Sequence, residues 1–207
     1  YFPPCLYHSF KEPIHIHNGN GCHYNHDTLL DLYNNVAHVG HSNPSVLQAY
    51  HEFTINTRYL HHALTRYAEH LSSYVPKGYK MVFVNSGSEA NDLALRVALS
   101  ATQRPLLASM EYSYHGTTYL CDKVSHLHSV GITKSSYPQD VLFLPRGDPT
   151  PLQQTHDTIA AFIVETIQGV GGNVPLDHTF LKKTFEHCRD HQIITIVDEV
   201  QTGFGRT

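Results

Sequence analysis

Three short polar segments of the sequence carry residue types that could take part in chemistry. Ser86-Gly87-Ser88 stands before a segment of helical character, where a glycine lets the free N–H groups of a helix N-terminus approach a phosphate. Tyr114 offers an aromatic ring that could stack on a flat ligand. Asp198 follows the largely apolar run 193–197, and a carboxylate buried there needs a cationic partner because an unpaired buried charge is costly.

Each segment also has a purely structural interpretation. Ser86 and Glu89 have the spacing of a capping box, which satisfies a helix N-terminus without a ligand. Tyr114 could be a packing residue, and Asp198 could cap a neighbouring helix. One cofactor, pyridoxal 5′-phosphate, would use all three segments, because its phosphate suits a helix N-terminus, its ring an aromatic face and its protonated ring nitrogen a carboxylate. A pyridoxal phosphate site is therefore the functional hypothesis, with capping and packing as the alternative.

The elements that would position these residues alternate between strand and helix. Short apolar runs predict strands at 81–84, 106–110, 141–144, 159–164 and 193–197. Helices are expected from the 86–88 turn to about residue 101 and over 180–191. This alternation is typical of an α/β fold with a largely parallel sheet covered by helices on both faces. Ligands of such sheets bind beyond the carboxyl ends of the strands, so the polar turns that follow the strands are expected to converge there.

The N-terminal part of the chain has a different pattern. Residues 1–32 are polar and rich in turn-forming residues, which predicts short strands or loops. Asn43 and Pro44 predict the cap and the first position of a helix. Apolar residues recur at helical spacing over 63–75, and Pro76 should end that helix.

The composition excludes several classes of protein. Of the 207 residues, 41% are hydrophobic and 15% are charged, which suits a globular chain, and the net charge of −4 disfavours nucleic acid or an anionic membrane as a partner. No apolar run reaches the roughly 18 residues of a spanning helix. Cys5, Cys22, Cys121 and Cys188 form no CxxC pair, so we expect free thiols in a reducing compartment, the cytoplasm, with the mitochondrion as the alternative.

Histidine is unusually frequent, with 18 in the chain. Several lie close in sequence, such as His61 and His62, and His191 follows Cys188 by three residues. No combination of pairs has zinc-finger or HExxH spacing, so the sequence predicts no metal site. A histidine-rich metal-binding protein remains the alternative.

Four motifs occur in order along the chain: Phe83-Val84-Asn85-Ser86-Gly87-Ser88-Glu89-Ala90-Asn91, Tyr114-His115-Gly116, Glu165-Thr166-Ile167-Gln168-Gly169 and Asp198-Glu199-Val200-Gln201-Thr202-Gly203-Phe204-Gly205-Arg206. Together they resemble the class III aminotransferases, which are pyridoxal-phosphate enzymes of fold type I. The resemblance implies that residues 1–75 form an N-terminal segment with interface helices, and that residues 76–207 form part of the cofactor-binding large domain.

The resemblance assigns roles around the cofactor phosphate and ring. Gly87 and Ser88 would hold the phosphate, with Ser86 nearby. Tyr114 would stack on one face of the ring, and Val200 would pack on the other.

Further roles concern the edge of the ring and the reacting centre. Asp198 would pair with the ring nitrogen, and Gln201 would approach the ring hydroxyl. Glu165 would lie beside the reacting centre, and His115 would support the turn that carries Tyr114.

The lysine that binds the cofactor covalently follows the Asp198 motif by some tens of residues in this family, and the chain ends at Thr207. None of the lysines present occupies the matching position: Lys77, Lys80, Lys123, Lys134, Lys182 and Lys183. We therefore expect a fragment that lacks its catalytic lysine and is inactive alone.

The segments 34–41 and 56–61 resemble a subgroup that contains ethanolamine-phosphate and hydroxylysine-phosphate phospho-lyases, with alanine–glyoxylate aminotransferase 2 as a near relative. Thr166 favours elimination, whereas Gln168-Gly169 is typical of aminotransferases. The resemblance thus implies a homodimer that acts on an amine or amino acid by transamination through an external aldimine. Phosphate elimination from an amino-alcohol phosphate is one alternative, and a non-catalytic descendant of the family is a second alternative.

Overall fold

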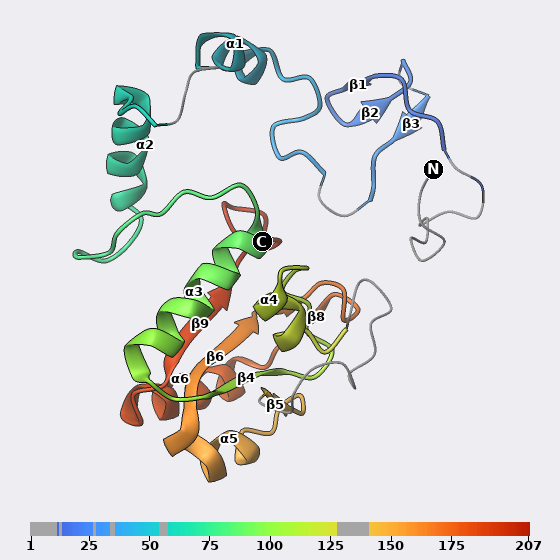
Figure 1. Cartoon of the computed structure of the whole chain (residues 1–207). Helices are drawn as coiled ribbons and strands as arrows, with labels where there is room; N and C mark the ends of the chain where they lie inside the picture. The colour runs from blue at the N-terminus through green and yellow to red at the C-terminus, as the bar shows by residue number, and fades with distance from the viewer. Residues whose placement is uncertain (1–11, 13, 27, 34–35, 54–57, 128–140) are drawn as a thin grey trace. The chain divides into compact units, whose positions relative to one another are not determined.

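The computed structural model describes residues 12, 14–26, 28–33, 36–53, 58–127 and 141–207 (Figure 1). The chain divides into two compact units, one formed mainly by Val84–Thr207 and the other by Tyr7–Phe83. Asn34, Asn35, Asn56 and Thr57 of the subgroup motifs lie outside the described residues, as do Cys5 and Lys134.

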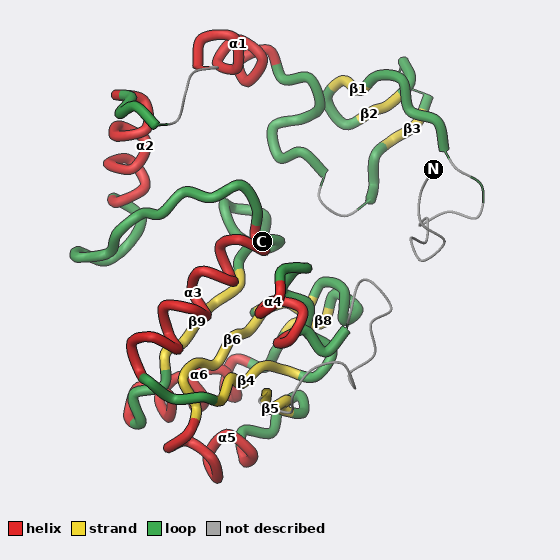
Figure 2. Tube along the Cα trace, in the orientation of Figure 1, coloured by secondary structure: helices red, strands yellow, loops and turns green. Residues whose placement is uncertain are grey.

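A parallel four-stranded sheet organises the larger unit (Figure 2). Its strands are β4 (Leu106–Met110), β5 (Val141–Leu144), β6 (Ile159–Glu165) and β9 (Ile194–Asp198), in the order β5-β4-β6-β9. Every neighbouring pair is parallel, and β6 pairs with β9 from Ala161↔Ile194 to Glu165↔Asp198. These four strands were predicted from their apolar runs, and their ends agree with the predictions to within one residue.

Helices cover both faces of this sheet, because alternate strand residues point to opposite sides. On one side Phe162 of β6 packs in a buried cluster with Leu152 of α5 (Thr150–Thr155) and Phe180 of α6 (His178–Asp190). On the other side Ile163 packs in a second cluster with Leu95 of α3 (Gly87–Thr102). The predicted α/β fold with a doubly covered parallel sheet is confirmed.

Smaller elements complete this unit. The six-residue α4 (Tyr119–Val124) adds Val124 to the cluster beneath α3. The 3-10 turn η2 (His156–Thr158) leads directly into β6. Strands β7 (Ile167–Gln168) and β8 (Val174–Pro175) form an antiparallel pair after β6.

The predicted strand at 81–84 is wrong. These residues adopt no strand, and Val82, Phe83 and Val84 are 67%, 44% and 40% exposed. A strand is stabilised by the hydrogen bonds of a neighbour, and among the described residues no strand pairs with this run. The apolar character of residues 81–84 was therefore insufficient to make them a strand.

The smaller unit contains short elements. Strands β1 (Gly19–Asn20), β2 (His23–Tyr24) and β3 (Leu29–Leu30) form an antiparallel sheet. Helix α1 (Pro44–Phe53) begins as predicted, because the Asn43 side chain accepts hydrogen bonds from the backbone N–H groups of Ser45 and Val46. Helix α2 (His62–Ser72) matches the second predicted helix, although none of its residues is buried.

Across the described ranges, no helix is long and apolar enough to cross a membrane.

Candidate functional site

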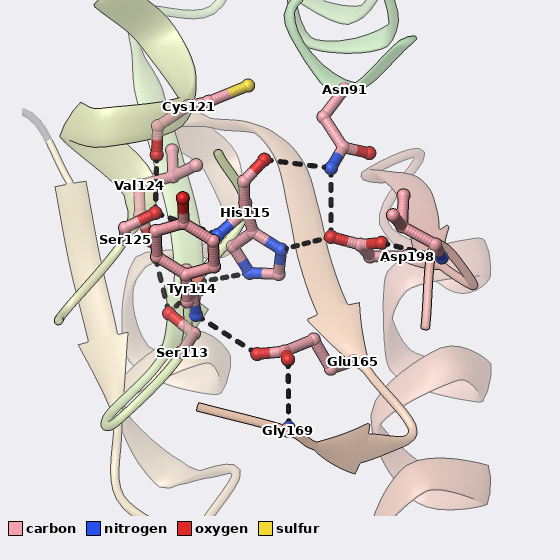
Figure 3. A network of polar contacts seen from close by, with 12 residues as sticks. Asn91, Ser113, Tyr114, His115, Cys121, Val124, Ser125, Glu165, Gly169 and Asp198 are labelled. Carbon is pink, nitrogen blue, oxygen red and sulfur yellow. Dashed lines mark hydrogen bonds and ion pairs between the residues drawn. The ribbon is translucent and has the colours of Figure 1, made fainter. Parts of the chain in front are cut away.

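The polar side chains of interest gather where β6 and β9 end (Figure 3). Glu165 is the last residue of β6 and Asp198 the last of β9, and the two are paired in the sheet register. Each is only 7% exposed. Two carboxylates are thus buried side by side at the carboxyl edge of the sheet, where the sequence analysis expected the polar turns to converge.

Three groups bind the Asp198 carboxylate. Its Oδ2 accepts a hydrogen bond from the Asn91 Nδ2 amide at 2.8 Å and lies 2.8 Å from His115 Nδ1 (Figure 3). Its Oδ1 accepts from the backbone N–H of Val200 at 3.0 Å. An ionised carboxylate only accepts, so the His115 ring carries a hydrogen on Nδ1. Asp198 therefore has side-chain partners from α3 and from the turn after β4.

The His115 ring is held from several directions. Its Nε2 lies 3.2 Å from Ser109 Oγ, and its backbone N–H donates to Ser125 Oγ at 2.8 Å. Its carbonyl oxygen accepts from Asn91 Nδ2 at 3.0 Å. The ring is fully buried, so its orientation toward Asp198 is fixed by buried hydrogen bonds.

Glu165 joins two turns. Its Oε2 accepts from the backbone N–H of Tyr114 at 3.0 Å, and its Oε1 accepts from the backbone N–H of Gly169 at 3.1 Å (Figure 3). Burial raises the pKa of Glu165, while these N–H groups and the neighbouring His115 oppose the rise. In this arrangement the carboxylate positions the backbone that carries the half-buried Tyr114.

The N-terminus of α3 contains the predicted capping interaction. Ser86 is the N-cap, and its Oγ accepts from the Glu89 backbone N–H at 3.2 Å. The Glu89 carboxylate in turn accepts from the Asn85 backbone N–H at 2.7 Å. The capping interpretation is therefore correct for Ser86 and Glu89, and it leaves the N–H groups of Gly87 and Ser88 at the free end of the helix.

Two glycines allow close approach around this helix end. A Cβ atom on Gly87 would lie 2.5 Å from Val200 Cγ2, so Val200 sits against the start of α3. Gly116 has φ +125°, and a Cβ there would lie 2.2 Å from Ser88 Oγ. Ser88 Oγ also accepts from the backbone N–H of Thr117 at 3.1 Å. The turn after β4 and the turn after β9 both meet the N-terminus of α3.

The structure thus brings most of the expected site residues to one edge. Gln201 lies against Gly169, where a Cβ would be 2.1 Å from the Gln201 Oε1 atom. The Val200 side chain stays 66% exposed. Together these contacts join the turns that follow β4, β6 and β9 to the first turn of α3.

Some residues of this network were missed by the sequence analysis. Asn91 was part of a quoted motif but received no role, although it bridges His115 and Asp198. Ser109, Ser113 and Ser125 are fully buried and support the His115 turn. A serine inside the apolar run 106–110 was the available signal, because a hydroxyl in a buried strand needs a partner.

The arrangement can bind a flat, anionic ligand that carries one protonated nitrogen. The N–H groups at the start of α3 suit an anion, and Asp198 suits a cation. The two are near each other, because Asn91 of α3 touches Asp198 directly.

Comparisons with known proteins identify what this chain resembles. The family model described as "Aminotransferase class-III" matches residues 8–207. The Drosophila melanogaster protein named alanine–glyoxylate aminotransferase 2-like is 32% identical over 95% of this chain and 47% of its own length. Ethanolamine-phosphate phospho-lyase homolog 1 of Caenorhabditis elegans is 32% identical over 86% of this chain and 46% of its own length. The chain thus spans about half the length of these relatives.

A solved structure has the same fold. The phospholyase from Arthrobacter in complex with phosphoethanolamine superposes with a TM-score of 0.80 at 30% sequence identity. The alignment covers 96% of this chain and 54% of that one.

Proposed function

Because the chain belongs to the class III aminotransferase family, we propose that it forms part of the pyridoxal-phosphate site of an aminotransferase that acts on a small amine or amino acid. The observation that carries this proposal is the buried Asp198 carboxylate, held by His115 and Asn91 beside the N-terminus of α3. The fold type I architecture of the family places its cofactor at the carboxyl edge of such a sheet.

The residues present fit this cofactor. An ionised carboxylate has about four acceptor positions, and three at Asp198 are filled by Asn91, His115 and Val200. The remaining position is available to a protonated ring nitrogen. Gly87 has no side chain, so Val200 can lie against the start of α3, and the N–H groups at this helix end suit a phosphate.

When bound, the cofactor supplies an electron sink through its protonated ring. Asp198 would hold the proton on the ring nitrogen, and His115 fixes the orientation of that carboxylate. Glu165 positions the backbone of Tyr114, whose ring would stack on one face of the cofactor, while Val200 would pack on the other.

The remaining residues act at the periphery of the ring. Gln201 would approach the ring hydroxyl, and the backbone of Gly87 and Ser88 would bind the phosphate, with Ser86 nearby as the cap of the helix. His115 has a further task as part of the Tyr114 turn, because its backbone N–H binds Ser125.

Elimination of phosphate is the second candidate function. The phospholyase from Arthrobacter, solved with phosphoethanolamine, is 30% identical to this chain, and the C. elegans relative carries the name of a phospho-lyase homologue. Both reactions would use the same cofactor site, and they differ in whether the substrate carries a phosphate leaving group.

Binding of pyridoxal phosphate to the full chain tests the site. Absorbance titration should saturate, and Asp198→Asn should weaken binding by about 10-fold or more because a charge-assisted hydrogen bond is lost. Glu199→Gln is the matched control, since Glu199 is the exposed neighbour and should leave the affinity unchanged. Equal affinities in the two variants, or no saturable binding, would contradict the proposal.

The two reactions are separated by their products. Release of inorganic phosphate from phosphoethanolamine would assign elimination, and transfer of the amino group from alanine to a 2-oxo acid would assign transamination. These product assays are made on the full-length protein, because the 207 residues are expected to be inactive alone. There, saturable binding with neither product would support the non-catalytic alternative.

We further propose the assembly expected of the family. Residues 1–75 would form an N-terminal segment with interface helices of a homodimer, and residues 76–207 would belong to the cofactor-binding domain. The division into compact units near residue 83 and the unburied α2, with Leu64 and Tyr67 each 46% exposed, support this assignment. Light scattering should give a dimer, and Leu64→Asp should shift it toward monomer.

The compartment we propose is the cytoplasm. Cys22, Cys121 and Cys188 are free cysteines, as is usual in a reducing compartment. A fluorescent fusion of the full-length protein, compared with a mitochondrial marker, tests this.

A further inference from the structure

Three histidines meet at the edge of the sheet opposite to the candidate site. His156 lies in η2, His187 lies in the last turn of α6, and His191 follows α6 directly. One ring nitrogen from each lies within 4.8 Å of the others. The sequence analysis expected no metal site because it found no combination of pairs with zinc-finger or HExxH spacing. It overlooked that His187 and His191 are four residues apart, and it had no means of bringing His156 near them.

The fold itself creates this cluster. His156 precedes β6, and His191 precedes β9, and these two strands are neighbours in the sheet. Both histidines therefore lie at the amino ends of adjacent parallel strands. In Figure 1, β6 starts beside α5 and points toward α4. Its seven residues separate the histidines from Glu165 by ~20 Å, so the cluster is distinct from the candidate site.

The three rings are already close together. The ring centroids of His156 and His191 are 3.8 Å apart, and those of His187 and His191 are 4.3 Å apart. His187 and His191 are separated by one helical turn, the spacing that places two imidazoles on one face to bind one metal ion. Two ligand atoms of a tetrahedral zinc ion lie about 3.4 Å apart, so small ring rotations are sufficient.

The hydrogen bonds of the cluster leave nitrogens for a ligand. His156 Nδ1 lies 2.6 Å from the Gln153 carbonyl oxygen, so Nδ1 carries the hydrogen and Nε2 keeps its lone pair. The Asp157 carboxylate lies 3.5 Å from that Nε2, a separation typical of two ligands on one ion. His187 Nε2 is buried and has no hydrogen-bond partner within the described structure.

The charges around the cluster are balanced. Arg104 binds the carbonyl oxygens of Ile159 and His191 with its guanidinium group. Arg189 and Asp190, both largely exposed, pair with each other at 3.7 Å. Asp157 is also exposed and contributes a negative charge.

We propose that His156, His187 and His191 form a three-histidine site for a divalent transition-metal ion of the zinc class, with Asp157 able to complete a tetrahedral set. Imidazole nitrogens are preferred ligands of such ions. Bound metal would tie the end of α6 to the turn before β6 and so stabilise the amino edge of the sheet.

Zinc titration of the full chain by calorimetry tests this site. We expect one zinc ion to bind per chain, with an affinity that falls by more than about 100-fold in His187→Ala and in His191→Ala. Losing a hydrogen-bond partner of a metal ligand already costs about 10- to 100-fold in affinity, and losing the ligand itself costs more. His178→Ala is the control, because His178 lies on the same helix, is exposed and is outside the cluster. Equal loss in His178→Ala, or retention of all zinc equivalents in both cluster variants, would overturn the proposal.

If circular dichroism shows that the variants do not fold, a second measurement tests the site in the unaltered chain. In the unaltered chain, zinc should protect His187 and His191 from carbethoxylation, as read by mass spectrometry, while His178 stays reactive. Unchanged modification of the cluster at saturating zinc would also overturn the proposal. Neither measurement depends on pyridoxal phosphate, so each outcome is independent of the proposed function.

Discussion

His115 Nδ1 lies 2.8 Å from Asp198 Oδ2, and this contact joins the turn after β4 to the end of β9. The two residues are 83 positions apart in the sequence, and both side chains are almost fully buried. Asn91 of α3 bonds to both, so one polar network connects three elements around the carboxylate. A buried charge that is held in this way has a defined position and direction before any ligand arrives.

Removing the imidazole should destabilise the larger unit. His115→Ala leaves Asp198 with one strong donor fewer and creates space in a buried site, which we expect to cost about 2–4 kcal/mol. Urea denaturation followed by circular dichroism measures this change. His178→Ala, on the exposed start of α6, should change the free energy of unfolding by less than about 0.5 kcal/mol. A cost at His115 no larger than at His178 would show that the buried pair is unimportant.

Glu165 should give stability a specific pH dependence. Its pKa in the folded protein is raised above the ordinary value of 4.5, chiefly by burial. Between these two values the folded state holds the proton more tightly than the unfolded state, so raising the pH through that window lowers the free energy of unfolding. Glu165→Gln should lack this decrease. We measure, by denaturation from about pH 4 upward, the free energy of unfolding of the unaltered protein minus that of Glu165→Gln. This difference should fall as the pH rises through the window, and a rise would contradict the prediction.

A side chain at Gly116 should be poorly tolerated. Gly116 has φ +125°, and a Cβ atom would lie 2.2 Å from Ser88 Oγ, so Gly116→Ala combines backbone strain with a collision. We expect a loss of about 2 kcal/mol or more. Gly147→Ala is the matched control, since Gly147 also has positive φ, +79°, but nothing lies within 4 Å of its Cβ position. Thermal unfolding should therefore separate the two variants, and coincident melting curves would argue against the close approach.

The cysteines should differ in their reactivity. Burial raises the pKa of the Cys121 and Cys188 thiols to about 11, whereas Cys22 is exposed. At pH 8 only about one thousandth of such a buried thiol is ionised, and the thiolate is the nucleophile. Peptide mapping after brief treatment with iodoacetamide should find Cys22 modified at least about 10-fold faster than the other two. After denaturation the three cysteines should react at similar rates. Similar rates in the folded protein would contradict the prediction.

The sequence alone determined the local elements of the larger unit. The apolar runs of β4 and β6 are almost fully buried in the parallel sheet, and those of β5 and β9 are partly buried at its edges, so their strand identity is visible without knowledge of the neighbours. Ser86 and Glu89 likewise predicted the start of α3, because a cap depends on residues three positions apart. The four motifs were also sufficient to identify the family. The strand predicted at 81–84 did not form, since a strand needs a partner that the local sequence does not specify.

Only the tertiary structure decided which distant side chains meet. Asn91 became a partner of Asp198, and Ser109 a partner of His115, because the sheet register and the packing of α3 bring them together. The cluster of His156, His187 and His191 arises in the same way, from two neighbouring strands that begin at one edge. Hydrogen bonds and metal ligation act over a few ångströms, and the chain order of residues does not record distances across the fold.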